Sequence, residues 1–209
     1  MRKITPYNIV KGFRYLRHFG LKQFLIRLDE RLEPEDVPYG PWYKNYMPTE
    51  KELAQMRQEK FKAPVTFSIL VPVYRTAPQV LREMIESVLA QVYPHFELCI
   101  VNADPSDGDV AAVLSAYRQK DKRISVQDLD ENAGIAGNTN AAFAMAGGDY
   151  VAFLDHDDLL SPAALFLMAR YVQSHPDTGL LYTDEDKISA DGREHFQPRS
   201  WETSLNEAI

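Results

Sequence analysis

Three carboxylates follow an apolar run in the second half of the chain. The run at residues 151–154 has the composition of a buried strand, and Asp155-His156-Asp157-Asp158 comes directly after it. In extended backbone, residues two apart point the same way, so the carboxylates of Asp155 and Asp157 are expected to converge. Converging carboxylates repel one another unless a proton, a hydrogen bond or a cation offsets their charge.

Oxygen ligands of this kind suit Mg²⁺ or Mn²⁺, which keep water ligands and complete their coordination with substrate phosphates. The pattern therefore predicts a metal site formed by Asp155 and Asp157, with His156 between them as a further ligand-binding residue. Such a cation would let an acidic protein bind a diphosphate, and it would stabilise the charge on a departing diphosphate. The competing interpretation is that one aspartate caps the helix expected from Pro162, although three exceed what a cap requires.

Polar and aromatic groups also follow two other apolar runs. Tyr74 ends the run at residues 66–74, where an aromatic ring could stack on a nucleobase or simply pack against the protein. Asn102 and Asp104 lie at the end of the run at residues 98–102. They could hydrogen-bond a base or a ribose, or they could serve only the chemistry of a turn.

A glycine-containing stretch and a second acidic cluster complete the candidate residues. Two glycines precede a helix within residues 131–140, which also contain Asn138. Glycine lets the backbone approach a ligand closely, but the stretch has the spacing of neither a phosphate loop nor a dinucleotide fingerprint. Asp184, Glu185 and Asp186 follow a later short apolar run. They either face a ligand or form a solvated turn.

These candidates fall between elements that alternate from residue 64 onward. Apolar runs predict strands, and amphipathic or Ala-rich stretches between them predict helices, the last with Ser161 as its N-cap and Pro162 at its first position. Buried strands separated by helices indicate an α/β fold with a mostly parallel sheet covered on both faces, and ligands bind such sheets at the carboxyl ends of the strands. The expected strands are residues 66–74, 98–102, 124–127, 150–154 and 180–182, and the expected helices are 78–91, 109–119, 139–146 and 162–174.

Residues 1–62 read as a helical N-terminal extension. Apolar residues recur at helical spacing between residues 9 and 32, with an interruption near Gly20, which predicts two short amphipathic helices. Thr49 and Glu52 have the spacing of a capping box at the start of a further helix. Residues 1–28 carry seven basic and no acidic residues. Their basic face either binds an anionic membrane surface or packs against the main domain or a second subunit.

Overall charge and composition exclude several classes of protein. The chain of 209 residues has a net charge of −7 despite its basic start, so a nucleic-acid partner is not expected. It has no apolar stretch of transmembrane length and no recognisable signal peptide, so we expect it in the cytoplasm, with the inner face of the cell membrane as the alternative. Its one cysteine, Cys99, lies in an apolar run and is expected to be inert core.

Taken in order, these motifs resemble the family 2 glycosyltransferases, which have the Rossmann-like GT-A fold. The resemblance covers roughly residues 64–190. The segment 183–187 and the basic N-terminus are similar to a bacterial subgroup that makes rhamnan or O-antigen-type polysaccharide. The matching segments are residues 69–74, 85–91 with 93–94, 97–101, 132–135 and 149–158.

The resemblance implies roles for individual residues. Pro72 and Tyr74 would border the nucleobase of the donor, and Asp155 and Asp157 would form the DxD pair, with Asp157 as the direct metal ligand. The implied activity is an inverting transfer of a sugar from a UDP- or dTDP-linked donor to a glycan or lipid-linked acceptor. Asn138 and His156 would then belong to the donor site.

Two departures from the family pattern change these expectations. Many members have adjacent aspartates at the end of the second strand, whereas this chain has Asn102-Ala103, so Asn102 or Asp104 would contact the base. The family's general base lies well downstream, in an acceptor-binding region of which residues 196–209 would be only the start. Residues 63–195 would therefore bind the donor without the catalytic base, for which only the 184–186 cluster could substitute.

Two other classes of protein compete with this interpretation. A haloacid-dehalogenase-type phosphohydrolase also ends a strand in Asp-x-Asp, but it needs the motif after the first strand and a Thr or Val after the second Asp. Here the motif follows the fourth predicted strand, and Asp158 follows it. A domain that binds a nucleotide sugar or a partner chain without turnover is the non-enzymatic alternative.

Overall fold

The computed structural model describes residues 39–183, 185–189, 192 and 194–196, together with Leu16, Arg17, Gly20, Leu21 and Phe24. Contacts divide the chain into two units, Pro48–Thr183 and a second unit formed by Met1–Met47 with Asp184–Ile209. The five early residues are helical, and the rest of the predicted amphipathic pair lies outside the described residues. Within the described part of the chain, no helix is both long and apolar enough to cross a membrane.

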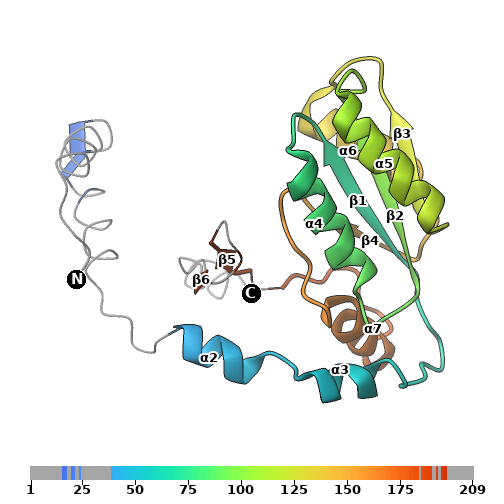
Figure 1. Ribbon diagram of the computed structural model, residues 1–209. Helices are drawn as coiled ribbons and strands as arrows, with labels where there is room; N and C mark the ends of the chain where they lie inside the picture. Colours follow the sequence, from blue (N-terminus) through green and yellow to red (C-terminus); the bar gives the residue numbers. More distant parts are fainter. Residues whose placement is uncertain are drawn as a thin grey trace. The chain divides into compact units, whose positions relative to one another are not determined.

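The unit Pro48–Thr183 contains one parallel sheet with strand order β3-β2-β1-β4 (Figure 1). The chain builds β1, β2 and β3 outward in one direction and then returns to place β4 on the other side of β1. This confirms the predicted α/β class with its mostly parallel sheet. The strands are β1 (Phe67–Val73), β2 (Phe96–Asn102), β3 (Ile124–Asp128) and β4 (Tyr150–Phe153), and the helices are α3 (Glu50–Met56), α4 (Pro78–Leu89), α5 (Gly108–Lys120), α6 (Gly134–Phe143) and α7 (Ala164–Ser174).

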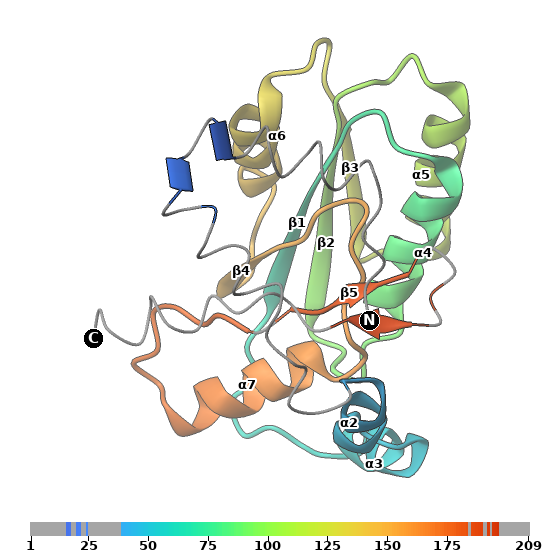
Figure 2. The same cartoon turned by 90° about the vertical axis from the view of Figure 1, so that its left-hand side faces the viewer.

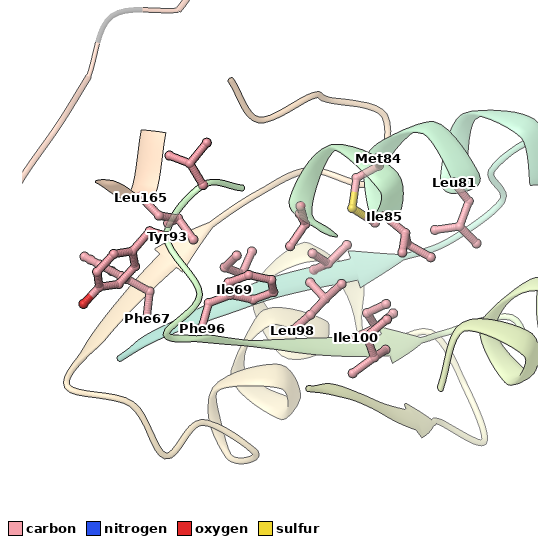
Figure 3. Close-up of a cluster of buried hydrophobic side chains, with 14 of the residues drawn as sticks. Phe67, Ile69, Leu81, Met84, Ile85, Tyr93, Phe96, Leu98, Ile100 and Leu165 are labelled. Atoms are coloured by element: carbon pink, nitrogen blue, oxygen red, sulfur yellow. The ribbon is translucent and has the colours of Figure 1, made fainter. Parts of the chain in front are cut away.

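Helices cover the sheet on both faces, because β1 and β2 carry apolar side chains on both faces. Helices α4 and α5 lie on one side of the sheet and α6 on the other (Figure 2). The larger core joins side chains of β1 and β2 to Leu81, Met84 and Ile85 of α4 and to Leu165 of α7 (Figure 3). The smaller core lies under α6 and contains Leu70, Cys99, Val101 and Ala142.

A polar clamp fixes the amino-terminal end of β4. Buried Ser68 of β1 donates its hydroxyl to Glu97 Oε1 at 2.7 Å, and the same carboxylate oxygen accepts from Gly147 N at 2.5 Å. Gly148 N donates to Ser68 Oγ at 2.9 Å, and Thr66 N donates to the Asp149 carboxylate at 2.8 Å. The short strand β4 therefore begins at a position set by side chains of two other strands.

The start of α7 differs from the prediction. The N-cap is Ala163, and it makes no side-chain capping hydrogen bond, so the expected Ser161 cap with Pro162 at the first position is wrong. Gln91, buried just after α4, takes over this function from a distant part of the chain. Its Oε1 accepts from Leu165 N at 3.1 Å, and its Nε2 donates to Ser161 O at 2.7 Å.

Two other predicted elements differ from the structure. The predicted strand at residues 180–182 is irregular, and Leu180 and Tyr182 are 83% and 72% exposed, so they have no core to cover. Helix α6 begins at Gly134, five residues before the predicted position. The side chain of Asn132 accepts from Gly134 N at 2.9 Å and supports this earlier start.

The capping box before α3 is confirmed. Thr49 Oγ1 accepts from Glu52 N, and Glu52 accepts from Thr49 N at 2.7 Å. Helix α3 belongs to the sheet unit, although residues 48–62 were expected to form part of the N-terminal extension. The other unit contains α2 (Tyr39–Tyr46) and an antiparallel pair, β5 (Lys187–Ile188) and β6 (His195–Phe196).

Cys99 is expected to be unreactive in the folded protein. It is fully buried in the smaller core, and burial, followed by the nearby Glu97 carboxylate, raises the pKa of its thiol to about 11. Because the thiolate is the reactive form, a thiol reagent at pH ~8 should label the chain only after a denaturant is added. Absorbance of the released chromophore measures the reaction. Rapid labelling of the native chain would contradict the buried position.

Candidate functional site

The predicted site residues lie along the carboxyl edge of the sheet. Tyr74 follows β1, Asn102 ends β2 and Asp155 lies two residues after β4. The order in which the chain adds strands reverses between β1 and β4, which makes the region above their carboxyl ends the expected ligand position in an open parallel sheet. The acidic motif therefore lies at the end of β4, next to the end of the neighbouring strand β1.

The acidic motif is a turn. Strand β4 ends at Phe153, and Asp158 N donates to Asp155 O at 3.2 Å. Extended backbone does not orient Asp155 and Asp157 as expected, because His156 and Asp157 form a turn. Both carboxylates instead flank the same turn, and both residues are exposed.

His156 anchors this turn to β1. Its Nδ1 lies 3.1 Å from the carbonyl oxygen of Pro72. A carbonyl oxygen can only accept, so Nδ1 carries the hydrogen in this contact. The contact joins two of the predicted site residues and involves only Nδ1 of the imidazole ring.

The two carboxylates suit a hard divalent cation. Within residues 39–183 and the other described positions, neither Asp155 nor Asp157 has an ion-pair partner. No group of three or more potential metal ligands occurs in that same part of the protein. Mg²⁺ and Mn²⁺ are commonly held by one or two carboxylates together with substrate phosphates and water, so two aspartates are a sufficient protein contribution.

Asn102 is buried, and its side-chain amide makes two hydrogen bonds within the protein. Its Nδ2 donates to Asp128 Oδ1 at 2.8 Å, and its Oδ1 accepts from Asp104 N at 3.2 Å. Asp104 is partly exposed, and its carboxylate accepts from Ser106 Oγ at 2.7 Å. Asn102 thus links the ends of β2 and β3 and shapes the loop that carries Asp104.

Asp128 is a candidate residue that the sequence interpretation missed. It is the last residue of β3, it is exposed, and its carboxylate is held by buried Asn102. The available signal was its position one residue beyond the predicted third strand, at the same edge of the sheet as the other candidate residues.

Asn138 shapes the loop before α6. It is 3% exposed; its Oδ1 accepts from Ala133 N at 3.1 Å, and its Nδ2 donates to Asn132 Oδ1 at 2.9 Å. Gly134 has a φ of 74°, which an L side chain rarely adopts. At Gly137 an added Cβ would lie 2.6 Å from Ala133 Cβ, so both glycines are needed for this tight entry to the helix.

Arg75 is a second residue that the sequence interpretation passed over. It has a φ of 52°, the one positive φ at a non-glycine position among the residues that the structure describes. Its guanidinium lies 4.9 Å from the centre of the Tyr74 ring. A strained backbone with an exposed cation, directly after β1, is typical of a ligand-binding position.

The strain at Arg75 can be separated from its charge. Arg75→Gly and Arg75→Ala both remove the guanidinium, but only glycine relieves the positive φ. We expect the free energy of unfolding of Arg75→Gly to exceed that of Arg75→Ala by about 1 kcal/mol. Urea unfolding followed by circular dichroism measures the difference. Equal stabilities would show that the backbone at this position is unstrained.

The second acidic cluster lies in the other unit. Asp186 Oδ2 is 2.7 Å from His195 Nδ1 and accepts from the Tyr39 hydroxyl at 3.3 Å, while the Tyr43 ring stacks on His195. Burial, and then the charge of Asp186, raise the pKa of Tyr43. Glu185 is exposed, and Asp184 lies outside the described residues. The cluster therefore joins α2 to the β5–β6 pair.

A cavity of about 260 Å³ lies elsewhere in the sheet unit. Its lining includes Phe61, Tyr93 and His95, which precede β1 and β2. It is therefore at the amino-terminal edge of the sheet, and the acidic turn is at the carboxyl edge.

Several known proteins are similar to this chain in sequence, and some solved structures are similar to part of it. The family model for Glycosyl transferase family 2 matches residues 68–207, which is more than half of the chain. Uncharacterized protein y4gI of Sinorhizobium fredii is 39% identical over 167 residues, and the O-antigen biosynthesis protein RfbC of Myxococcus xanthus is 31% identical over 179 residues. These matches cover 78% and 84% of this chain but only 18% and 14% of the two relatives.

Similarity to solved structures extends over about half of the chain. S. aureus TarS 1–349 in complex with UDP-GlcNAc is 29% identical, with a TM-score of 0.49, over 53% of this chain and 32% of that chain. Mannosyltransferase PcManGT from Pyrobaculum calidifontis, in complex with GDP-Man and Mn²⁺, is 21% identical with a TM-score of 0.47, over 57% of this chain and 37% of that chain.

Proposed function

This chain belongs to glycosyl transferase family 2, and from that premise we propose that its sheet edge binds a nucleotide-diphosphate sugar through a divalent cation held by Asp155 and Asp157. The observation that carries the proposal is the acidic turn beside the end of β1, where two exposed carboxylates have no ion-pair partner in the described part of the protein. A bound Mg²⁺ or Mn²⁺ would supply positive charge to the diphosphate as it leaves.

The other edge residues divide into contacting and supporting roles. We assign Pro72 and Tyr74 to the border of the nucleobase, with uracil and thymine as the first candidates, and Asp104 to the base or ribose. We also assign Arg75 to the diphosphate, because it is an exposed cation next to Tyr74. Asn102 and Asn138 support the site, since their side chains are buried and already hydrogen-bonded within the protein.

The reaction that we propose for the whole protein is an inverting sugar transfer. The acceptor hydroxyl attacks the anomeric carbon, the bond from that carbon to the diphosphate oxygen breaks, and a carboxylate takes the hydroxyl proton. We propose that this carboxylate is not that of Asp186, because Asp186 is already engaged by His195 and Tyr39. The names of RfbC and of the putative teichuronic acid biosynthesis glycosyltransferase TuaG favour a bacterial polysaccharide, free or lipid-linked, as acceptor.

Calorimetry of this chain with UDP and with dTDP, each with and without Mn²⁺, tests donor binding. We expect binding of at least one nucleotide that depends on the metal, and no hydrolysis of a phosphomonoester. If neither nucleotide binds in the presence of Mn²⁺, the proposed site is wrong. Metal-dependent binding without sugar transfer by the full-length protein would instead support a non-catalytic binding domain.

A further inference from the structure

We propose that His156 is a positioning residue. Its side chain takes the place of the last backbone hydrogen bond between β1 and β4 and thereby fixes the Asp155–Asp158 turn. The functional consequence of this inference rests on the proposed donor site, whereas its structural part does not.

Two backbone bonds from β4 to β1 lie four residues apart on each strand, and a parallel ladder repeats every two residues. Tyr150 N donates to Thr66 O at 3.2 Å, and Leu154 N donates to Leu70 O at 3.2 Å. By this alternation, the next acceptor on the same side of β1 is Pro72 O, and its regular donor would be the backbone N–H of residue 156. The side chain of that same residue occupies the position, with His156 Nδ1 at 3.1 Å from Pro72 O.

Pro72 explains why the ladder ends here. Proline has no N–H, so it cannot donate back to the carbonyl of residue 154, and the regular pairing stops. Its own carbonyl still requires a partner, because an unpaired, partly buried carbonyl is costly. The imidazole satisfies this carbonyl and releases the backbone of residue 156 from extended geometry.

The freed backbone then forms the acidic turn. Asp158 N donates to Asp155 O at 3.2 Å, and the two exposed aspartates stand on either side of the anchored residue. One contact from His156 thus restrains both carboxylates relative to β1. Residues that support metal ligands in this way typically contribute 10- to 100-fold to affinity.

Asparagine and glutamine variants distinguish the two ring nitrogens. The Nδ2 of asparagine can occupy the position of imidazole Nδ1, whereas the Nε2 of glutamine reaches the position of imidazole Nε2. With UDP and Mn²⁺, we expect His156→Asn to bind within about threefold of the original chain. His156→Gln and His156→Ala should bind about 10- to 100-fold more weakly.

Two measurements without nucleotide make the inference independent of donor binding. Long-range ¹H–¹⁵N spectra in mildly alkaline buffer should show the hydrogen of His156 on Nδ1. Exchange of the Asp158 amide should accelerate about tenfold in the alanine and glutamine variants but not in the asparagine variant, as for the loss of one hydrogen bond.

The outcomes separate the two claims. A hydrogen on Nε2, glutamine in place of asparagine as the tolerated substitution, or no difference among the variants in amide exchange would overturn the positioning role. If the original chain binds neither UDP nor dTDP with Mn²⁺, the donor site fails, while the spectra and the exchange rates still decide what His156 does.

Discussion

Asp157→Asn should lower the affinity for UDP in the presence of Mn²⁺ by about 100-fold, the effect of removing one charge from a close charge pair. The exposed Asp157 carboxylate has no ion-pair partner among the described residues, so its replacement by a neutral isostere leaves no protein cation uncompensated. Affinity without metal should not fall, because a carboxylate repels the anionic nucleotide when no cation lies between them. Calorimetry with each variant, with and without Mn²⁺, measures both quantities.

Asp177→Asn is a suitable control for charge. Asp177 is also exposed, lies in the same unit after α7, and its removal changes the net charge by the same amount. If the two variants weaken binding equally, the effect is a general electrostatic one and the assignment of Asp157 as a metal ligand is wrong. Asp155→Asn should resemble Asp157→Asn, because both carboxylates are proposed ligands.

Gly148→Ala should destabilise the sheet unit by about 2–3 kcal/mol. A Cβ at this position would lie 2.6 Å from the Thr66 carbonyl oxygen and 2.7 Å from Ser68 Oγ, well inside normal contact distance. Backbone atoms of β1 cannot give way without disturbing its pairing with β4. Urea unfolding followed by circular dichroism is the appropriate measurement, because both tryptophans, Trp42 and Trp201, lie outside Pro48–Thr183.

The neighbouring glycine provides a matched control. At Gly147 an added Cβ would meet only Glu97 Oε1, at 3.7 Å, which is ordinary contact. Gly147→Ala should therefore change the free energy of unfolding by less than about 0.5 kcal/mol. Similar destabilisation by both substitutions would show that the close contacts at Gly148 are not the cause of the loss of stability.

The sheet could be predicted from the sequence because its signals are local. The apolar runs around Ile69, Ile100 and Val151 lie between stretches with helical patterns, and each became a parallel strand within about two residues of the expected bounds. The run at residues 180–182 looked similar, but a three-residue run cannot reveal whether a core exists for it to cover. Strand composition predicts burial only where the rest of the fold provides a partner surface.

The details of the site depended on long-range contacts that no local pattern contains. Ser161 has a favourable type and position for a helix cap, yet Gln91 binds that helix start from 74 residues away. The sequence predicts Asn102 and Asn138 as ligand contacts, and it does not reveal that their buried amides hydrogen-bond Asp128 and Ala133 within the protein. Asp128 follows the predicted third strand by one residue, but the contact with Asn102 that marks it as a site residue is likewise long-range.

The two ends of β4 are both attached to β1, by Ser68 to Gly148 at one end and by Pro72 to His156 at the other. The number of residues between Gly148 and His156 is therefore fixed by the distance between these two attachment points. One residue more or fewer would shift the strand residues that follow the change to the opposite face and would move the aspartates relative to the end of β1. Relatives that use the same turn should tolerate changes of residue type along this segment far better than any change in its length.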